Sequence, residues 1–281
     1  MNKLSTEKRT ALLSCLVEGN SLRATSRMTG VSVNTVMKFV VDVGRVCSDF
    51  QDRTFRNLTS KRIQCDEIWA FCGSKAKNTS PEKKAQGWGD AWTWTAIDAD
   101  TKLIPCWMVG DRSAETAWHF MHDLKGRLAN RVQLTTDGYR PYLMAVTDNF
   151  GANIDFAQLQ KVYGTTPSGA EGRYSPAQCM GAKKTHITGT PDFNHVSTSY
   201  VERANLTMRM SMRRFTRLTN AHSKKLENHE AAVALHFMHY NFCRIHSTLR
   251  CTPAMQAGLT TKVWELSDIA ELLDLQERLA A

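Results

Sequence analysis

The chain has 281 residues, of which 42% are hydrophobic and 22% are charged, as in ordinary soluble globular proteins. This length is sufficient for one large core and a smaller second unit. The net charge of +9 favours a polyanionic partner. No apolar run approaches the roughly 20 residues that are needed to cross a bilayer, so no membrane function is expected.

Eight cysteines are scattered through apolar surroundings, and no two have the two-residue spacing of a zinc knuckle. No signal peptide is expected at the N-terminus. These features predict a reducing, cytoplasmic location with free and buried thiols.

The N-terminal segment, residues 1–55, is predicted to be all helical. Serines precede three stretches whose apolar residues recur at helical spacing, and a serine in that position caps the first turn of a helix. Glycines separate the stretches and allow the turns between them. The three helices are expected between residues 5 and 19, over 22–28 and over 33–41.

The second and third of these helices resemble a helix-turn-helix. Ala24 is small enough for the two helices to cross closely. Asn34, Thr35 and Lys38 would then face the major groove of DNA. A three-helix bundle with no DNA role is the alternative, and the basic charge of the chain favours DNA binding over it.

Residues 62–250 are predicted to form a mixed α/β unit, and residues 251–281 a C-terminal helical tail. Strands followed by alternating helices and strands indicate a sheet flanked by helices. Residues 164–194 are rich in Gly, Ser, Thr and Pro and are interpreted as a long loop insertion. Strands are expected over residues 62–71, 92–98, 103–109 and 132–136, and helices over 113–128, over 140–148 and, with breaks, from 197 to 245.

Three acidic residues stand in distinct settings along the α/β unit. Asp66 lies within the first expected strand, Asp137 follows the fourth, and Glu202 opens a basic helix. An acid in an apolar strand is costly unless it is paired or bound to a metal. Two ions of an oxygen-preferring metal, roughly 4 Å apart, clamp the attacking and leaving oxygens of a phosphodiester. If the three carboxylates converge, we expect two Mg²⁺ or Mn²⁺ ions and a protein that cuts and joins DNA.

Each acid also has an ordinary structural interpretation. Asp137 precedes a glycine and is the type of residue that caps its own turn. Glu202 is an acid that the dipole at the start of a helix favours. Asp66 alternates with Glu67 along the strand, so only one of the two is expected to face a metal. The prediction therefore depends on the set of three rather than on any single acid.

Basic residues gather after Glu202. The segment 203–250 has nine Lys or Arg residues and two acidic ones, which accounts for most of the net charge. A phosphate backbone is expected to lie along it. The histidines are interpreted as helix packing or phosphate contacts rather than as zinc ligands, because no cysteine pair accompanies them. The tryptophans, including Trp69, Trp88, Trp92 and Trp94, are interpreted as core and edge packing rather than as platforms for stacked bases.

Several stretches of the α/β unit form a set: DEIWAFCGSK (66–75), WTAID (94–98), TDGY (136–139) and VERANLTMR (201–209). This set resembles bacterial insertion-sequence transposases, with the nearest likeness in the insertion-sequence-one family of DDE-type enzymes. The similarity extends over residues 62–250, roughly two thirds of the chain. Its most specific part is the run after Glu202, which continues into RRFTR (213–217) and SKK (223–225).

The resemblance implies that Asp66, Asp137 and Glu202 form the metal-binding triad of a ribonuclease-H-like core. Asn205 and Arg209, one and two turns after Glu202, would orient its carboxylate or hold the DNA strand. The other basic residues expected to contact DNA are Arg213, Arg214, Lys224 and Lys225.

The activity that the resemblance implies is DNA transposition. Such a protein binds double-stranded DNA at the terminal inverted repeats of its element and at the target, and it works as a homo-oligomer because two element ends must be paired. The implied location is the bacterial cytoplasm, in association with the nucleoid. Two alternatives stay open: a metal-dependent nuclease that cuts without joining, and a non-catalytic helix-turn-helix regulator.

Overall fold

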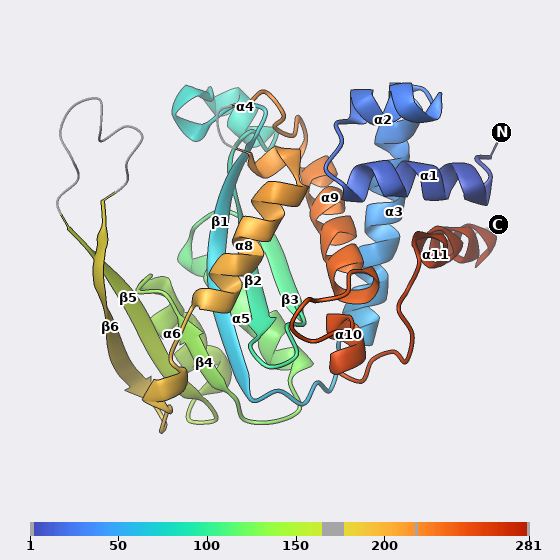
Figure 1. Ribbon diagram of the computed structural model, residues 1–281. Coiled ribbons are helices and arrows are strands. Elements are labelled where there is room, and N and C mark those ends of the chain that lie inside the picture. Colours follow the sequence, from blue (N-terminus) through green and yellow to red (C-terminus); the bar gives the residue numbers. More distant parts are fainter. Residues whose placement is uncertain (1–2, 165–176, 217–218, 280–281) are drawn as a thin grey trace.

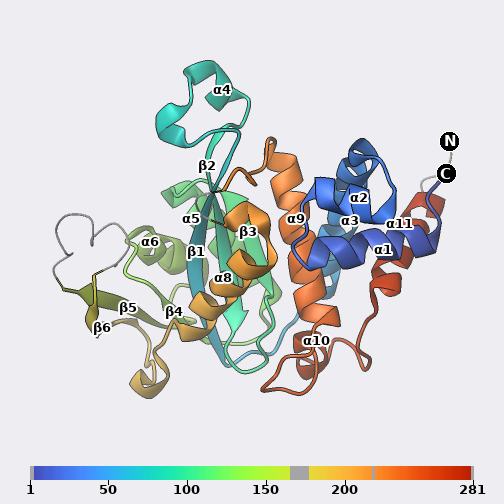
Figure 2. The same cartoon turned by 45° about the horizontal axis from the view of Figure 1, so that its top comes forward.

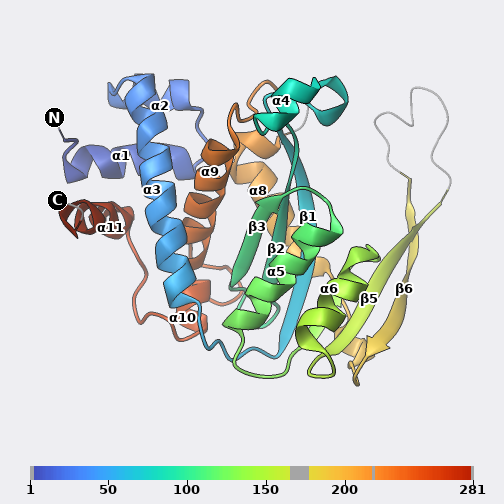
Figure 3. The same ribbon diagram turned by 180° about the vertical axis from the view of Figure 1, so that it is seen from behind.

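The computed structural model describes residues 3–164, 177–216 and 219–279. These residues form a sheet with helices on both faces and a layer of helices beside it (Figure 1). The first and the last described helices lie side by side at the outer edge of this layer (Figures 1 and 3). Within the described residues, no helix combines the length and the apolar character needed to span a bilayer.

The three N-terminal helices begin where the sequence predicts. Each follows a serine whose side-chain oxygen accepts the backbone N–H three residues further on, at 3.4 Å for Ser5, 3.1 Å for Ser21 and 3.2 Å for Ser32. Gly30 ends the second helix with φ of 70°, a conformation that glycine adopts without strain. The helices are α1 (Thr6–Val17), α2 (Leu22–Thr29) and α3 (Val33–Thr54).

Helix α3 is much longer than the expected range of 33–41. It continues to Thr54 because its second half packs along α9 (Leu226–Met238). At the crossing, a Cβ added to Gly44 would lie 2.4 Å from the main-chain oxygen of Ala231, so the two backbones are in contact there. Glycine inside a helix costs about 1 kcal/mol relative to alanine, and this tertiary contact outweighs that local cost.

The sheet is mixed and has six strands in the order β3-β2-β1-β4-β5-β6. β1 pairs antiparallel with β2 and parallel with β4, and β4 pairs parallel with β5. A mixed sheet flanked by helices confirms the α/β prediction, and the strand order is compatible with a ribonuclease-H-like core. The strands are β1 (Arg62–Cys72), β2 (Gly89–Asp98), β3 (Cys106–Gly110), β4 (Gln133–Thr136), β5 (Asp155–Tyr163) and β6 (Cys179–Thr188).

Helices cover both faces of the sheet. α5 and α6 lie on one face, over a buried core that includes Trp94 and Phe120 (Figure 3). α8 lies on the other face, where Val201 and Met208 pack on Ile68 of β1 (Figure 1). This packing fixes the position of α8 over β1. These helices are α5 (Ala114–Arg127), α6 (Pro141–Phe150) and α8 (Ser199–Ser211).

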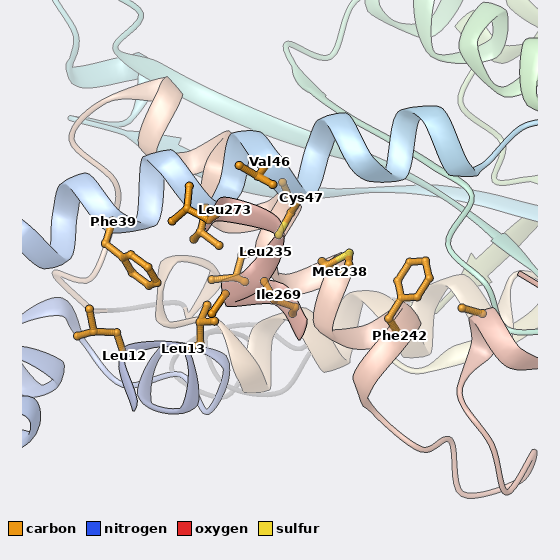
Figure 4. Packing of buried hydrophobic residues seen from close by; sticks show 14 of the residues in the cluster. Leu12, Leu13, Phe39, Val46, Cys47, Leu235, Met238, Phe242, Ile269 and Leu273 are labelled. Atoms are coloured by element: carbon orange, nitrogen blue, oxygen red, sulfur yellow. The ribbon is translucent and has the colours of Figure 1, made fainter. Parts of the chain in front are cut away.

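The layer of helices beside the sheet has a single buried core. Leu12 of α1, Phe39 of α3, Leu235 of α9 and Ile269 of α11 all belong to it (Figure 4). The N-terminal helices therefore share their core with the last third of the chain. The predicted tail, 251–281, contains two of the contributing helices, α10 (Pro253–Gln256) and α11 (Leu266–Leu279).

A buried arginine strengthens the contact between the first and the last described helices. The guanidinium of Arg9 donates to Asp274 at 3.1 Å and to Glu277 at 3.0 Å, and its side chain is only 5% exposed. Because a buried charge is strongly unfavourable without partners, this pairing fixes α1 against α11.

The segment 164–194 differs from the loop that its composition predicts. Its described part contains strand β6, which pairs antiparallel with β5 as the edge of the sheet, and the short helix η2 (Phe193–His195). Most residues of β6 are exposed, so the strand lacks the alternation of apolar and polar residues by which a half-buried strand is identified. Residues 165–176 of the expected insertion lie outside the described residues.

Short elements complete the connections. Residues 73–88, between β1 and β2, form a projection at one end of the sheet, most visible in Figure 2. A Cβ at Gly73, where φ is 70°, would lie 2.1 Å from the ring of Trp88, so that ring packs directly on the glycine. The short elements are η1 (Ala76–Asn78), α4 (Pro81–Ala85), η3 (Arg213–Phe215) and the π-helix η4 (His239–Cys243).

Candidate functional site

Strands β1 and β4 bring three carboxyl groups together. Their parallel pairing ends at Cys65 and Thr136. Asp66 and Glu67 are the next residues of β1, and Asp137 is the first residue after β4. One carboxylate oxygen of each acid lies within 4.8 Å of the other two. We call Asp66, Glu67 and Asp137 the acidic cluster.

The membership of Glu67 differs from the expectation that only one of two adjacent strand residues would face a metal. The two side chains do leave β1 in different directions: Asp66 meets Asn205 of α8, whereas Glu67 meets Arg112, just before α5. Asp137 lies where β4 has left the edge of β1, so its carboxylate is accessible from both directions. Asp66 and Glu67 therefore both approach Asp137, although adjacent residues of a strand point to opposite faces of the sheet.

Burial and like charge disfavour the ionised forms of the acidic cluster. Burial, followed by the charge of Asp137, raises the pKa of Asp66 to about 6. Burial likewise raises the pKa of Glu67 to about 7, and it raises the pKa of Asp137 above its ordinary value. A positive charge placed next to these buried carboxyl groups would stabilise their ionised forms.

The atoms around the cluster fit a hard divalent cation. All of the donors are oxygens, which Mg²⁺ and Mn²⁺ prefer. The buried Oδ1 of Asn205 has no hydrogen-bond partner among the described residues, whereas the buried hydroxyl of Tyr142 interacts with the carboxylate of Glu67. A buried acceptor without a partner is costly, and a bound cation with its waters would supply partners of the required sign.

Helix α8 is held in register with β1. Oε1 of Gln64 accepts the backbone N–H groups of Tyr200 and Val201 at 2.8 and 3.2 Å, and so satisfies the first turn of the helix. Two residues further along β1, Oδ2 of Asp66 accepts the amide of Asn205 at 2.9 Å. Two strand residues span about 6.6 Å, and four to five helical residues span about 7 Å, so the two spacings match.

Glu202 lies beside the acidic cluster but does not belong to it. Its Oε1 accepts the hydroxyl of Thr198 at 2.7 Å, and its Oε2 is paired with the ammonium of Lys161 on β5. The charge of Glu202 nevertheless contributes to the raised pKa values of Asp66 and Asp137. Of the predicted triad, the structure therefore brings Asp66 and Asp137 together and holds Glu202 next to them.

Arg112 is the main residue of the site that sequence reasoning missed. Its Nη2 lies 3.2 Å from Oε2 of Glu67 and 3.8 Å from Oδ2 of Asp137. Its guanidinium carbon lies 4.8 Å from the ring centroid of Trp92 and 4.1 Å from that of Tyr139. A single arginine between a strand and a helix has no distinguishing pattern. Lys161 was missed because strand β5 was not among the expected strands.

The basic residues that were expected to contact DNA, in the last turn of α8 and after it, differ in how far they are exposed. Arg213, Lys224 and Lys225 are exposed, whereas Arg209 is partly buried in the last turn of the helix. The guanidinium of Arg214 donates to Oγ of Ser223 at 2.6 Å, and burial lowers its pKa to about 10. Arg214 therefore holds the segment before α9 in place, and the neighbouring basic side chains are the accessible ones.

The expected groove-contacting residues lie at the start of α3. Asn34, Thr35 and Lys38 are exposed, while Val31 and Val36 are buried. This arrangement leaves the three polar side chains available to a ligand. Three helices with a glycine turn do not by themselves establish a DNA-binding helix-turn-helix, so that assignment stays a prediction.

The site combines an acidic cluster, an adjacent glutamate on a helix, and basic residues on both sides of them. Comparison of the sequence with models of protein families and with curated proteins found no match for the chain.

Proposed function

We propose that this chain is a DDE-type DNA transposase, which binds the ends of an insertion sequence and catalyses metal-dependent DNA cleavage and strand transfer. The observation that carries the proposal is the meeting of Asp66, within β1, and Asp137, directly after the neighbouring strand β4, below the helix that bears Glu202. The strand order, compatible with a ribonuclease-H-like core, supports it. The basic residues that follow Glu202 are suited to the phosphate backbone.

Asp66 and Asp137 are the residues that would hold the metal, as Mg²⁺ or Mn²⁺. A pair of such ions supplies activation of the attacking oxygen and stabilisation of the leaving oxygen. Asn205 fixes one oxygen of Asp66 through its amide hydrogen bond, which orients the carboxylate. Arg112 compensates part of the charge of the cluster and holds Glu67.

Glu202 acts as the third metal ligand in this proposal. Lys161, which is paired with Glu202, would compete with the metal for this carboxylate. Both side chains are more than one third exposed, at 37% and 36%. An ion pair exposed to this degree contributes only about 0–1 kcal/mol, so a divalent cation at the cluster competes with it easily. The pair holds Glu202 close to the cluster and leaves it available.

Asn34, Thr35 and Lys38 would read the terminal inverted repeats from a helix-turn-helix, and Arg213, Lys224 and Lys225 would follow the phosphates beside the far end of β1. Pairing of two element ends requires at least a homodimer. The proposed location is the bacterial cytoplasm, where the substrate is the nucleoid DNA.

The direct test is a joining assay. A labelled duplex from the DNA that flanks the coding region, with a free 3′ hydroxyl, is incubated with supercoiled plasmid, protein and Mg²⁺ or Mn²⁺. We expect labelled plasmid with the wild-type chain, and none with Asp137→Asn, which keeps the shape of the side chain and removes its charge. Asp148→Asn, a change of an exposed acid on α6, is the matched control and should join normally. Undiminished joining by Asp137→Asn would refute the assignment.

A metal-dependent nuclease that cuts without joining is the second candidate. One observation favours it: the acid that completes the compact cluster is Glu67 and not Glu202. Cleavage of plasmid by Glu67→Gln and Glu202→Gln separates the two assignments. The transposase proposal predicts that Glu202→Gln loses both cleavage and joining. If Glu67→Gln is inactive, Glu202→Gln is active, and the wild-type chain never joins the supplied end, the nuclease is correct.

A further inference from the structure

A row of partly exposed rings begins at the acidic cluster and runs along the sheet toward the projection formed by residues 73–88. Its members are Tyr139, Trp92, Trp69, Phe71 and His222, and we call it the aromatic strip. Trp69 and Trp92 are paired residues of β1 and β2, so their side chains share one face of the sheet. This is the face on which α5 and α6 pack, and the ends of β1 and β2 near α4 extend beyond these helices (Figure 3).

Ring contacts or a shared cation join the members of each half of the strip, and the cross-strand pair Trp69 and Trp92 connects the two halves. The guanidinium of Arg112 lies against both Tyr139 and Trp92, at 4.1 and 4.8 Å from the ring centroids. The centroids of Trp69 and Phe71 are 5.7 Å apart, and those of Phe71 and His222 are 4.5 Å apart in a stacked arrangement. Since Arg112 also contacts Glu67 and Asp137, the strip starts at the acidic cluster itself.

The outer part of the strip has no buried core to pack on. Trp92 and Tyr139 rest partly on the core under α5 and α6, but Trp69 and Phe71 belong to none of the described hydrophobic cores and do not pack against them. Trp94, by contrast, is fully buried, as the packing interpretation of the tryptophans requires. For Trp69 that interpretation is incomplete, because its ring is partly exposed and packs against none of these cores.

Lysines lie beside the outer rings of the strip, on the face that also carries Asp90, the cross-strand partner of Phe71. The ammonium of Lys75 lies 5.6 Å from the ring centroid of Trp69 and 5.9 Å from that of Phe71. Nζ of Lys224 lies 2.8 Å from Nε2 of His222. The connection 73–88 has four lysines and one acidic residue. Rings with cations on both sides are suited to a ligand that has flat faces and regularly spaced negative charges.

We propose that the aromatic strip binds unpaired nucleotides of the DNA strand next to the phosphodiester held at the acidic cluster, with a base stacked on Trp69 and phosphates near Lys75 and Lys224. This inference rests on the proposed function for the identity of the nucleic acid as DNA. Every base has a π-face, so such stacking tolerates any sequence. Paired bases in a duplex are stacked on each other and do not present these faces, so the strip selects a single strand.

The test measures strand binding in the absence of catalysis. Fluorescence anisotropy of a labelled oligothymidylate, in chelator, gives the affinity of the wild-type chain and of Trp69→Ala. We expect Trp69→Ala to bind about tenfold to a hundredfold more weakly, from the contribution of one base–aromatic stack. Trp69→Phe, which keeps a flat ring, should retain most of the affinity. Binding of a duplex should change by less than about twofold in either variant.

Trp118→Ala is the matched control. Trp118 is 37% exposed on α5 and is stacked on His122 with ring centroids 4.9 Å apart, so it resembles the Phe71–His222 pair outside the strip. Its replacement should leave oligothymidylate binding unchanged. An oligonucleotide that contains 5-iododeoxyuridine should crosslink under light to Trp69 or Phe71, which peptide mass spectrometry identifies.

Two results would overturn the inference: equal binding of oligothymidylate by Trp69→Ala and the wild-type chain, or an equal loss of single-strand and duplex binding in Trp69→Ala with its thermal melting unchanged. If Trp69→Ala does not fold, the inference is tested by the oligothymidylate affinity of Trp69→Phe and by the position of the crosslink in the wild-type chain. Failure of the proposed function is distinct, because it shows as an absence of joined product while oligothymidylate binding still depends on Trp69.

Discussion

Replacement of Asp66 by asparagine should stabilise the protein while it removes metal binding. In the folded chain, burial and the charge of Asp137 raise the pKa of Asp66 from 3.8 to about 6. Each unit of such a difference corresponds to about 1.4 kcal/mol, so the ionised Asp66 opposes folding by about 3 kcal/mol at neutral pH. Asparagine has nearly the same shape and can still accept the amide hydrogen bond of Asn205.

The direction of the pH dependence follows from the raised pKa. Below pH 3.8 the carboxyl is protonated in both the folded and the unfolded chain, so ionisation carries no penalty. The penalty grows as the pH rises toward about 6 and is complete above that value. Asp66→Asn should therefore be more stable than the wild-type chain by about 1–3 kcal/mol at pH 8, and this advantage should shrink as the pH falls from 6 to 4.

Urea denaturation followed by circular dichroism measures this difference, in chelator and again with Mg²⁺. A metal at a hundred times its Kd stabilises the wild-type chain by about 2.7 kcal/mol, and it should stabilise Asp66→Asn by much less. The reasoning would be wrong if Asp66→Asn in chelator were less stable than the wild-type chain at pH 8. It would also be wrong if its advantage were the same at pH 4. Asp148→Asn should show neither effect, because that residue is exposed on α6.

Three further variants test helix packing and ion pairs, one at the site and two in the layer of helices beside the sheet. Gly44→Ala should destabilise the chain by about 1–3 kcal/mol in urea, because the new methyl group overlaps Ala231; a gain in stability would contradict the close crossing of α3 and α9. Arg112→Ala should cost about 2–4 kcal/mol by leaving Glu67 buried without its partner, and adding Glu67→Gln should recover part of that loss in a double-mutant cycle. Arg9→Ala should cost about 3 kcal/mol and increase hydrogen exchange in α1 and α11, and protection equal to the wild type would show that the buried ion pair does not join them.

The local features of the fold were predictable from the sequence. Ser5, Ser21 and Ser32 act as helix caps through contacts that span three residues, so a short window contains the whole signal. The strand that carries Asp66 and the helix that carries Glu202 were expected at nearly their observed positions. Asn205 was expected to orient the carboxylate of Glu202 or to hold the DNA strand, whereas its amide donates to Asp66, and Glu202 is bonded to Thr198 and Lys161.

The features that were missed depend on contacts between distant parts of the chain. Helix α3 continues past Gly44 because of a helix more than 180 residues further on, at Ala231. Strand β6 is stabilised by pairing with β5 at an exposed edge, where no apolar pattern is needed. Arg112 becomes part of the site only through the fold, which places it against Glu67. These contacts have no counterpart in local composition.

The core shared by the first and the last helices has a consequence for biosynthesis. Leu12 and Leu13 find their partners Ile269 and Leu273 only after nearly the whole chain has been translated. Until then, the N-terminal helices expose apolar surface, which is a target for chaperones. Premature termination before α11 would leave that surface uncovered, so a truncated product would be directed to proteolysis.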